Sequence, residues 1–182
     1  MSKVNLFGII GGGLTLFLVG VSLFFPWWRL TAGENIVVVD VSPVATGLSL
    51  LGKALTIPLI AALNLSSLLS FLACGIVMLA YSFLPSKSYS KDLLNFAYLT
   101  PLLGVIFLVG GVFATVSAVN GYLGLSIPVL GSTVGTLPSS LTQNLTVKVT
   151  FSSGFLWPFG FAIVSSVLCV IARLYHRRLL KA

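Results

Sequence analysis

Charged side chains are scarce in this sequence: of 182 residues, ten are lysine or arginine and three are aspartate or glutamate. A water-soluble domain normally has about 25% charged residues, because its surface must stay hydrated. Here the charged fraction is 7% and the hydrophobic fraction is 57%. So few charges cannot cover a soluble particle of 19.2 kDa, and the composition therefore indicates that lipid surrounds most of the chain.

Cysteine and histidine are almost absent as well, with two cysteines and one histidine. Cys74 and Cys169 each lie within an apolar run and not in a loop, which argues against a disulfide framework and favours a role as small apolar packing residues. His176 has no carboxylate or thiol near it in the sequence, so it does not indicate a metal site. The basic residues around it are interpreted as a stop-transfer anchor, with contact to anionic lipid as the alternative.

No Asp, Glu, Lys, Arg or His falls inside the long apolar runs. Proton pumps, ion-coupled transporters and voltage sensors depend on ionisable residues within the membrane, which are costly to keep there. We therefore expect no catalytic residue, no cofactor and no metal, although a passive channel built from several copies remains open.

What the chain does contain is a set of four apolar runs, each long enough to cross a hydrocarbon core of ~30 Å as a helix. Pro58 lies in the first turn of the second run, where proline is tolerated. A fifth span over 122–130 is rejected because it is too short and contains Pro128. The sequence predicts one domain over 1–182 with helices at about 4–28, 55–84, 93–118 and 154–173.

The cations are distributed unevenly around these four expected spans. Four crossings place both termini and the short 85–92 loop on one side, where the positive-inside rule puts the cytoplasm. The long loops 29–54 and 119–153 then face outward. The chain is expected to be a multi-pass protein of the cell membrane with both termini cytoplasmic. The cations that it places inside are Lys3, Lys87, Lys91, Arg173, Arg177, Arg178 and Lys181. Because cations flank the spans and form no basic domain face, nucleic acid is not an expected partner.

Both long loops contain strand-like stretches. Residues 36–41 are mostly β-branched, and in 144–151 the residues Val147, Val149 and Phe151 alternate with polar ones. The expected fold is an all-α membrane protein, a four-transmembrane-helix bundle with a small extracellular β-sheet from the two outer loops. Turn residues are expected at Asn120-Gly121 and around Gly131 and Gly135. Asn144-Leu-Thr matches the pattern of a glycosylation acceptor.

Small residues recur every four positions along three of the expected helices. Such spacing lets helix backbones approach closely in lipid. Packing within the bundle is the favoured interpretation, and packing between protomers is the alternative. Asn64 on the second helix is expected to make an interhelical hydrogen bond. The expected packing residues are Gly8, Gly12, Ala62, Ser66, Ser70, Gly110 and Ala114.

The end of the first expected helix reads Pro26-Trp27-Trp28-Arg29-Leu30-Thr31-Ala32, followed by Gly33-Glu34-Asn35-Ile36-Val37. This segment resembles the start of the first extracellular segment of claudins, and the layout is similar to that of the claudin and peripheral-myelin-protein superfamily. The resemblance implies an outer sheet that contacts neighbouring proteins. It departs from the family at Gly47-Leu48-Ser49, which lacks the following tryptophan, and in having no loop cysteine.

A second interpretation of the same residues needs no relatives. Trp27 and Trp28 suit the lipid headgroup layer, and Arg29 could reach phosphate. The residues expected to make protein contacts through the outer loops are Trp27, Trp28, Arg29, Val147, Val149 and Phe151.

The sequence favours a non-enzymatic protein that contacts membrane lipids and associates with itself or with another membrane protein. The first alternative is an accessory subunit of a larger respiratory or transport complex. The second is a membrane enzyme acting on lipid or quinone, for which the titratable candidates are few and scattered: Glu34, Asp40, Asp92 and His176.

Overall fold

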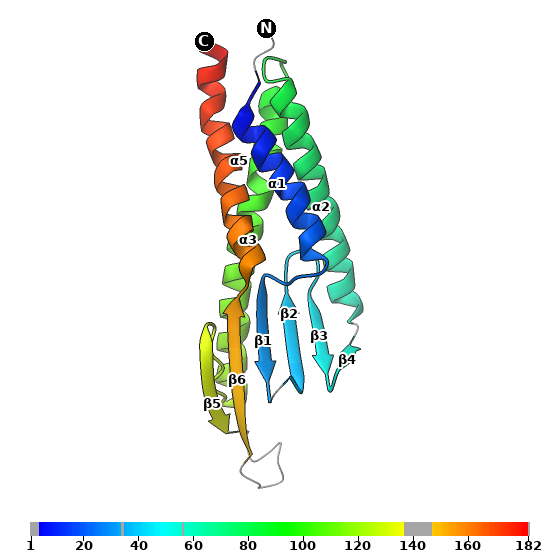
Figure 1. Ribbon diagram of the computed structural model, residues 1–182, viewed down its shortest axis with the longest axis vertical. Helices are drawn as coiled ribbons and strands as arrows, with labels where there is room; N and C mark the ends of the chain where they lie inside the picture. Colours follow the sequence, from blue (N-terminus) through cyan, green and yellow to red (C-terminus); the bar gives the residue numbers. More distant parts are fainter. Residues whose placement is uncertain (1–3, 34, 56, 137–146, 182) are drawn as a thin grey trace.

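The computed structural model describes residues 4–33, 35–55, 57–136 and 147–181. Within these residues an elongated helix bundle carries a β-sheet at one end (Figure 1). Both chain ends and the α2–α3 turn lie at the opposite end. The helices are α1 (Leu6–Ser22), α2 (Pro58–Phe83), α3 (Ser90–Leu123) and α5 (Trp157–Lys181).

Three of these helices are long and apolar enough to cross a membrane: α2, the Ser90–Tyr122 part of α3, and the Trp157–His176 part of α5. The fourth, α1, is apolar but has 17 residues. At 1.5 Å per residue it is about 25 Å long, somewhat less than a hydrocarbon core of ~30 Å. Length and composition thus support three of the four expected spans.

The helix ends differ from the expected ones for local reasons. α1 ends at Ser22, and the amides of Phe24 and Phe25 both donate to the carbonyl of Val21 in the turn that follows. α3 continues past the expected turn at Asn120-Gly121 and ends at Leu123, before Gly124, whose φ of 62° suits glycine. α5 continues beyond residue 173, since lysine and arginine favour helices and their charge favours a helix C-terminus.

The sheet is antiparallel and six-stranded, with order β4-β3-β2-β1-β6-β5. The two expected strand stretches both enter it, but they do not pair with each other, because β1 lies between them. Trp28 in β1 faces Val41 on one side and Phe155 on the other. The strands are β1 (Trp28–Ala32), β2 (Val37–Val41), β3 (Gly47–Leu50), β4 (Lys53–Leu55), β5 (Gly131–Thr136) and β6 (Lys148–Phe155).

The expected combination of helices with a sheet built from the 29–54 and 119–153 segments is confirmed. The sheet is larger than the small one expected beside an all-α bundle, and Trp28, expected at the end of the first helix, begins a strand. Gly131–Thr136 forms β5 instead of a turn, because pairing with β6 gives its small residues a partner; Gly135 packs against the ring of Phe151. The second strand begins later than expected, at Lys148, and runs on to Phe155. Residues 144–146, with the glycosylation pattern at Asn144, lie outside the described residues.

The two faces of the sheet differ in polarity. On β6, Phe151 is buried and Val149 half-buried, whereas Lys148 and Thr150 are exposed, which gives the expected alternation. On the outer face, Arg29 Nε and Nη2 donate to Asp40 Oδ1 and Oδ2 at 2.6 and 3.0 Å. Hydrogen bonding to Asp40 raises the pKa of Arg29 above its ordinary value. Arg29 is therefore paired within the sheet, and the expected phosphate contact is not needed to satisfy it.

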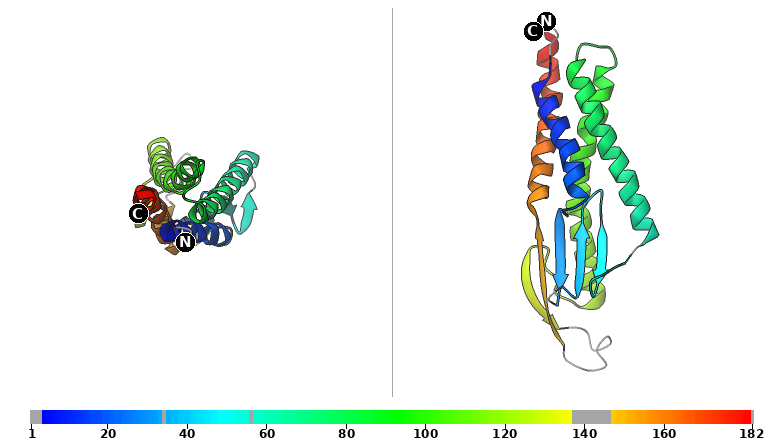
Figure 2. Two further views of the ribbon diagram at one scale, coloured as in Figure 1. Left: turned by 90° about the horizontal axis from the view of Figure 1, so that it is seen from above. Right: turned by 45° about the vertical axis from the view of Figure 1, so that its right-hand side comes forward.

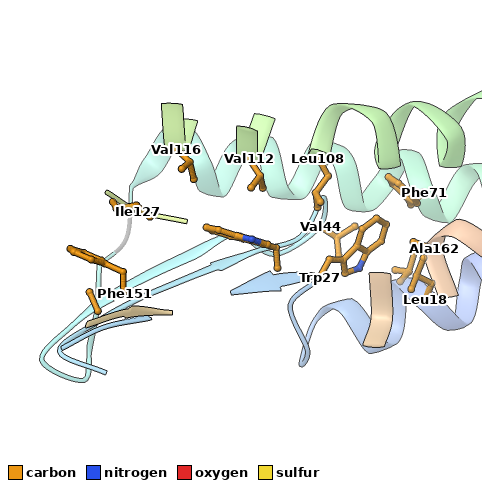
Figure 3. Close-up of a cluster of buried hydrophobic side chains, with 13 residues drawn as sticks. Leu18, Trp27, Val44, Phe71, Leu108, Val112, Val116, Ile127, Phe151 and Ala162 are labelled. Carbon is orange, nitrogen blue, oxygen red and sulfur yellow. The ribbon is translucent and has the colours of Figure 1, made fainter. Parts of the chain in front are cut away.

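The main core joins the sheet to the helices, as the labelled side chains in Figure 3 show. Trp27 is 1% exposed, its Nε1 donates to Ser22 Oγ at 2.7 Å, and its ring meets Phe71 edge-on. Trp28 is 3% exposed, and its Nε1 donates to the carbonyl of Val129 at 2.9 Å. The interpretation of these two rings as headgroup anchors is wrong, because both are core residues with satisfied indole nitrogens.

The structure separates the small residues into two groups. Gly8 and Gly12 lie against α2, where a Cβ on Gly12 would come within 3.1 Å of the Gly75 carbonyl. The other expected packing residues are exposed, either to the space between α2 and α3 or on the outer faces of these helices, and they do not pack within this chain. These residues are Ala62, Ser66, Ser70, Gly110 and Ala114.

Candidate functional site: a lateral cleft beside the sheet

A cleft of about 900 Å³ lies between α2, α3 and the inner face of the sheet. Two views show that the end of α2 nearest the sheet lies apart from the rest of the bundle (Figure 2). The α2 wall presents serine, asparagine, aliphatic and phenylalanine side chains, and the α3 wall presents glycine, threonine, aliphatic and phenylalanine residues. The cleft is lined by Trp28, Leu30, Val39, Val41, Ser42, Pro43, Thr46, Ile60, Leu63, Asn64, Ser66, Ser67, Ser70, Phe71, Thr100, Gly104, Phe107, Leu108, Gly111, Val112, Thr115, Val116, Val119 and Ile127.

Packing explains why the two helices are close at one end and apart at the other. Near the α2–α3 turn, Cys74 and Met78 are fully buried, and Cys74 Sγ donates to the carbonyl of Ala97 at 2.8 Å. Phe71 then lies over Gly104, where any Cβ would collide with the ring. Beyond Phe71 toward the sheet, no large side chain fills the space between the helices, and the cleft begins there.

The outer part of α2 is held to the sheet by one side chain. Asn64 Nδ2 donates to the carbonyl of Thr46, and Asn64 Oδ1 accepts from the Thr46 amide, both at 3.1 Å. This pair fixes α2 to the β2–β3 connection and so sets the width of the cleft. The expected interhelical hydrogen bond of Asn64 is therefore wrong: the partner is a backbone segment that sequence spacing cannot identify.

The cleft is lined by apolar side chains, hydroxyls and one amide. None of the described residues that line it is acidic, basic, histidine, cysteine or tyrosine. The hydroxyl of Ser70 donates to the Ser66 carbonyl at 2.9 Å and that of Thr100 to the Phe96 carbonyl, so each is satisfied within its own helix. General acid–base catalysis needs a positioned titratable group, which these lining residues do not supply.

A buried polar cluster lies near the other end of the bundle. Asn5 Nδ2 donates to Tyr81 Oη at 2.9 Å and to the Ala172 carbonyl at 3.0 Å. Tyr81 Oη is also 3.0 Å from His176 Nδ1, and His176 is 5% exposed. The stop-transfer role of the basic residues around His176 stays a prediction. The structure adds a buried role for His176, whose ring lies beside Tyr81 in the contact between α1, α2 and α5.

We expect Asn5→Ala to lower the free energy of unfolding by about 2 kcal/mol, because it leaves buried hydrogen-bond partners unsatisfied and removes a helix cap. Asn5 also accepts from the Gly8 amide as the N-cap of α1. Denaturation of the purified protein in mixed micelles measures the change. Ser70→Ala, whose hydroxyl is exposed, serves as the control at about 0.5 kcal/mol or less. Equal effects of the two changes would contradict the role given to Asn5.

The remaining sequence-predicted residues do not form a reactive site in the described part of the chain. Cys74 and Cys169 are buried and free, in agreement with packing roles. Asp40 lies in the sheet, whereas Asp92 and His176 belong to α3 and α5 near the opposite end. Glu34 lies outside the described residues. No group of three or more potential metal ligands occurs among the residues that the structure describes.

Of the residues expected to make contacts, Trp28 is the one that borders the cleft. Trp27 is enclosed in the core, Arg29 is paired on the outer face, and Val149 and Phe151 belong to β6. Val147, just before β6, is 38% exposed. No protein-family model matches the sequence, and no curated protein matches it either.

Proposed function

We propose that this chain is a multi-pass protein of the cell membrane that crosses the bilayer four times, with both termini in the cytoplasm and the sheet outside. Three helices are suited to crossing by length and composition. The proposal adds α1, whose Leu6, Ile10 and Phe17 are 67%, 52% and 54% exposed and are better suited to lipid than to water. The excess of cations at the end that carries the termini supports the orientation.

Its proposed function is non-enzymatic contact with copies of itself or with a neighbouring membrane protein through the outer sheet. The observation that carries this proposal is the edge strand β5. Edge strands are normally protected by charge, proline or short length, because their free backbone groups pair with other chains. β4 has three residues, one of them Lys53. β5 has six residues, Gly131–Thr136, none charged and none proline, and Val134 is 67% exposed.

The claudin-like segment supports the same proposal. The motif residues from Trp28 to Ala32 form β1, which pairs with strands from both outer segments. The resemblance implies an outer sheet that contacts neighbours, as this one is proposed to do. The loop cysteines of the family are absent. Buried side chains such as Trp27 and Phe151 connect the sheet to the helices through the hydrophobic core.

Crosslinking from β5 tests this function. We expect Ser132→Cys, an exposed β5 position, to give a discrete dimer or partner adduct with a short bismaleimide in native membranes. Adding Val134→Lys places a charge on the edge and is expected to reduce the yield about fivefold, since edge charges oppose strand pairing. Recovery of monomer alone from native membranes would overturn the proposal.

A matched control distinguishes the edge from the rest of the sheet. Val38→Lys introduces the same charge on β2, which is paired on both sides, and is expected to leave the Ser132→Cys adduct unchanged. If both lysine variants reduce the yield equally, the loss comes from general damage and not from the β5 edge. Adducts made only with subunits of a larger assembly would favour the accessory-subunit alternative.

A further inference from the structure

The cleft opens sideways between α2 and α3, the two longest helices that are suited to crossing a membrane. On the proposed membrane placement, on which this inference rests, the part of the cleft that lies between the helices away from the sheet opens toward the bilayer. We infer that the cleft is a binding site for the hydrocarbon chain of a membrane lipid. The site is distinct from the β5 edge, since it lies on the inner face of the sheet.

The chemistry of the lining selects hydrocarbon over a polar ligand. The apolar wall includes Leu108, Val112 and Val116 of α3, which are 7%, 5% and 6% exposed. The hydroxyls of Ser70 and Thr100 donate to carbonyls of their own helices. Most of the other lining side chains are apolar, and a largely apolar cavity favours an apolar molecule over a polar ligand.

The size of the cleft fits a lipid chain. Its volume of about 900 Å³ is within the range of about 300–1,000 Å³ that is typical of small-molecule sites.

The sheet closes one end of the cleft. Trp28 and Leu30 of β1, Val39 of β2 and Ile127 border the cleft toward the sheet. On the outer side, the Asn64–Thr46 hydrogen bonds keep α2 fixed to the sheet. A lipid chain therefore enters between the helices and lies along α3, and its methylene groups contact the three buried aliphatic residues of that helix.

Photolabelling can detect a lipid acyl chain in the cleft. The probe is a phosphatidylcholine with a diazirine near the middle of one acyl chain, in vesicles of phosphatidylcholine and phosphatidylglycerol that contain the full-length protein. Fragment-level mass spectrometry then compares insertion at Leu108, Val112 and Val116 with insertion at Phe113. Phe113 is 52% exposed on α3 and does not line the cleft, so it reports ordinary lipid contact. We expect insertion at both sets of residues.

Two adjacent glycines provide a matched pair of variants. A Cβ at Gly110 or at Gly111 meets no atom within 4 Å, and both residues are exposed on α3. Only Gly111 lines the cleft. Gly111→Trp fills part of the space and is expected to reduce cleft labelling about tenfold, since the loss of two buried methylene groups has that effect. Gly110→Trp is expected to leave it unchanged.

Ser70→Phe fills the cleft from the α2 wall and gives an independent second variant, which is expected to act like Gly111→Trp. Labelling of Phe113 without any labelling of Leu108, Val112 or Val116 would overturn the inference while leaving the membrane placement intact. Equal cleft labelling in the Gly110→Trp and Gly111→Trp proteins would also overturn it. Absence of label from Phe113 as well would count against the proposed membrane crossing itself.

Discussion

We expect Trp27→Ala to lower the free energy of unfolding by about 4 kcal/mol, as for other fully buried tryptophans. Trp27 is 1% exposed and lies where α1, α2 and the sheet meet. Its truncation removes the hydrogen bond to Ser22 Oγ and the edge-on contact with Phe71, whose ring centroid is 6.3 Å away. Chemical denaturation in mixed micelles measures the loss.

Trp157→Ala is the control for this prediction. Trp157 is 49% exposed at the start of α5 and contacts the rings of Phe25 and Phe161. Aromatic pairs of this kind contribute about 0.5–1.5 kcal/mol each, so its replacement is expected to cost well below the loss at Trp27. If the two variants unfold alike, Trp27 does not connect the sheet to the bundle as described.

We expect Gly12→Leu to destabilise the protein by about 3 kcal/mol, because it forces α1 away from α2. A Cβ at Gly12 would lie 3.1 Å from the Gly75 carbonyl and 3.2 Å from the Leu79 side chain. The carbonyl belongs to the backbone of α2 and cannot move aside without displacing that helix. The same micelle denaturation measures this change.

The neighbouring residue supplies the control. Gly13 is exposed, and a Cβ there would meet nothing within 4 Å. Gly13→Leu is expected to change stability by about 0.5 kcal/mol or less, or to stabilise α1, because leucine favours helices over glycine. If Gly12→Leu is as mild as Gly13→Leu, the close α1–α2 contact does not exist.

The sequence predicts the order of the long helices and the position of one strand, because the apolar pattern of a whole segment decides whether it is buried or lies in lipid. The expected second helix, 55–84, differs from α2 by three residues at one end and one at the other. Val149 and Phe151 alternate with polar neighbours, so the period-two pattern correctly predicts a strand there. Such patterns depend on burial summed over many residues.

Features that depend on a distant partner were not predictable in this way. β5 is glycine-rich and resembles a turn in sequence, and it becomes a strand because β6 lies beside it. Trp27 and Trp28 follow a long apolar run, a position typical of interfacial anchors, yet the sheet and α2 enclose them. The cleft arises from the divergence of α2 beyond Phe71, which no local pattern encodes.

Four crossings place the sheet on one side of the membrane and the termini on the other, and they require α1, the shortest of the four helices, to cross as well. Single cysteines at Ser2, Lys87 and Ser152 test this arrangement directly with a membrane-impermeant maleimide. The native thiols, Cys74 and Cys169, are fully buried and give the baseline. We predict that intact cells label Ser152→Cys alone, and that Ser2→Cys and Lys87→Cys react only after permeabilisation. Labelling of Ser2→Cys together with Ser152→Cys in intact cells would show that α1 does not cross and would contradict this account.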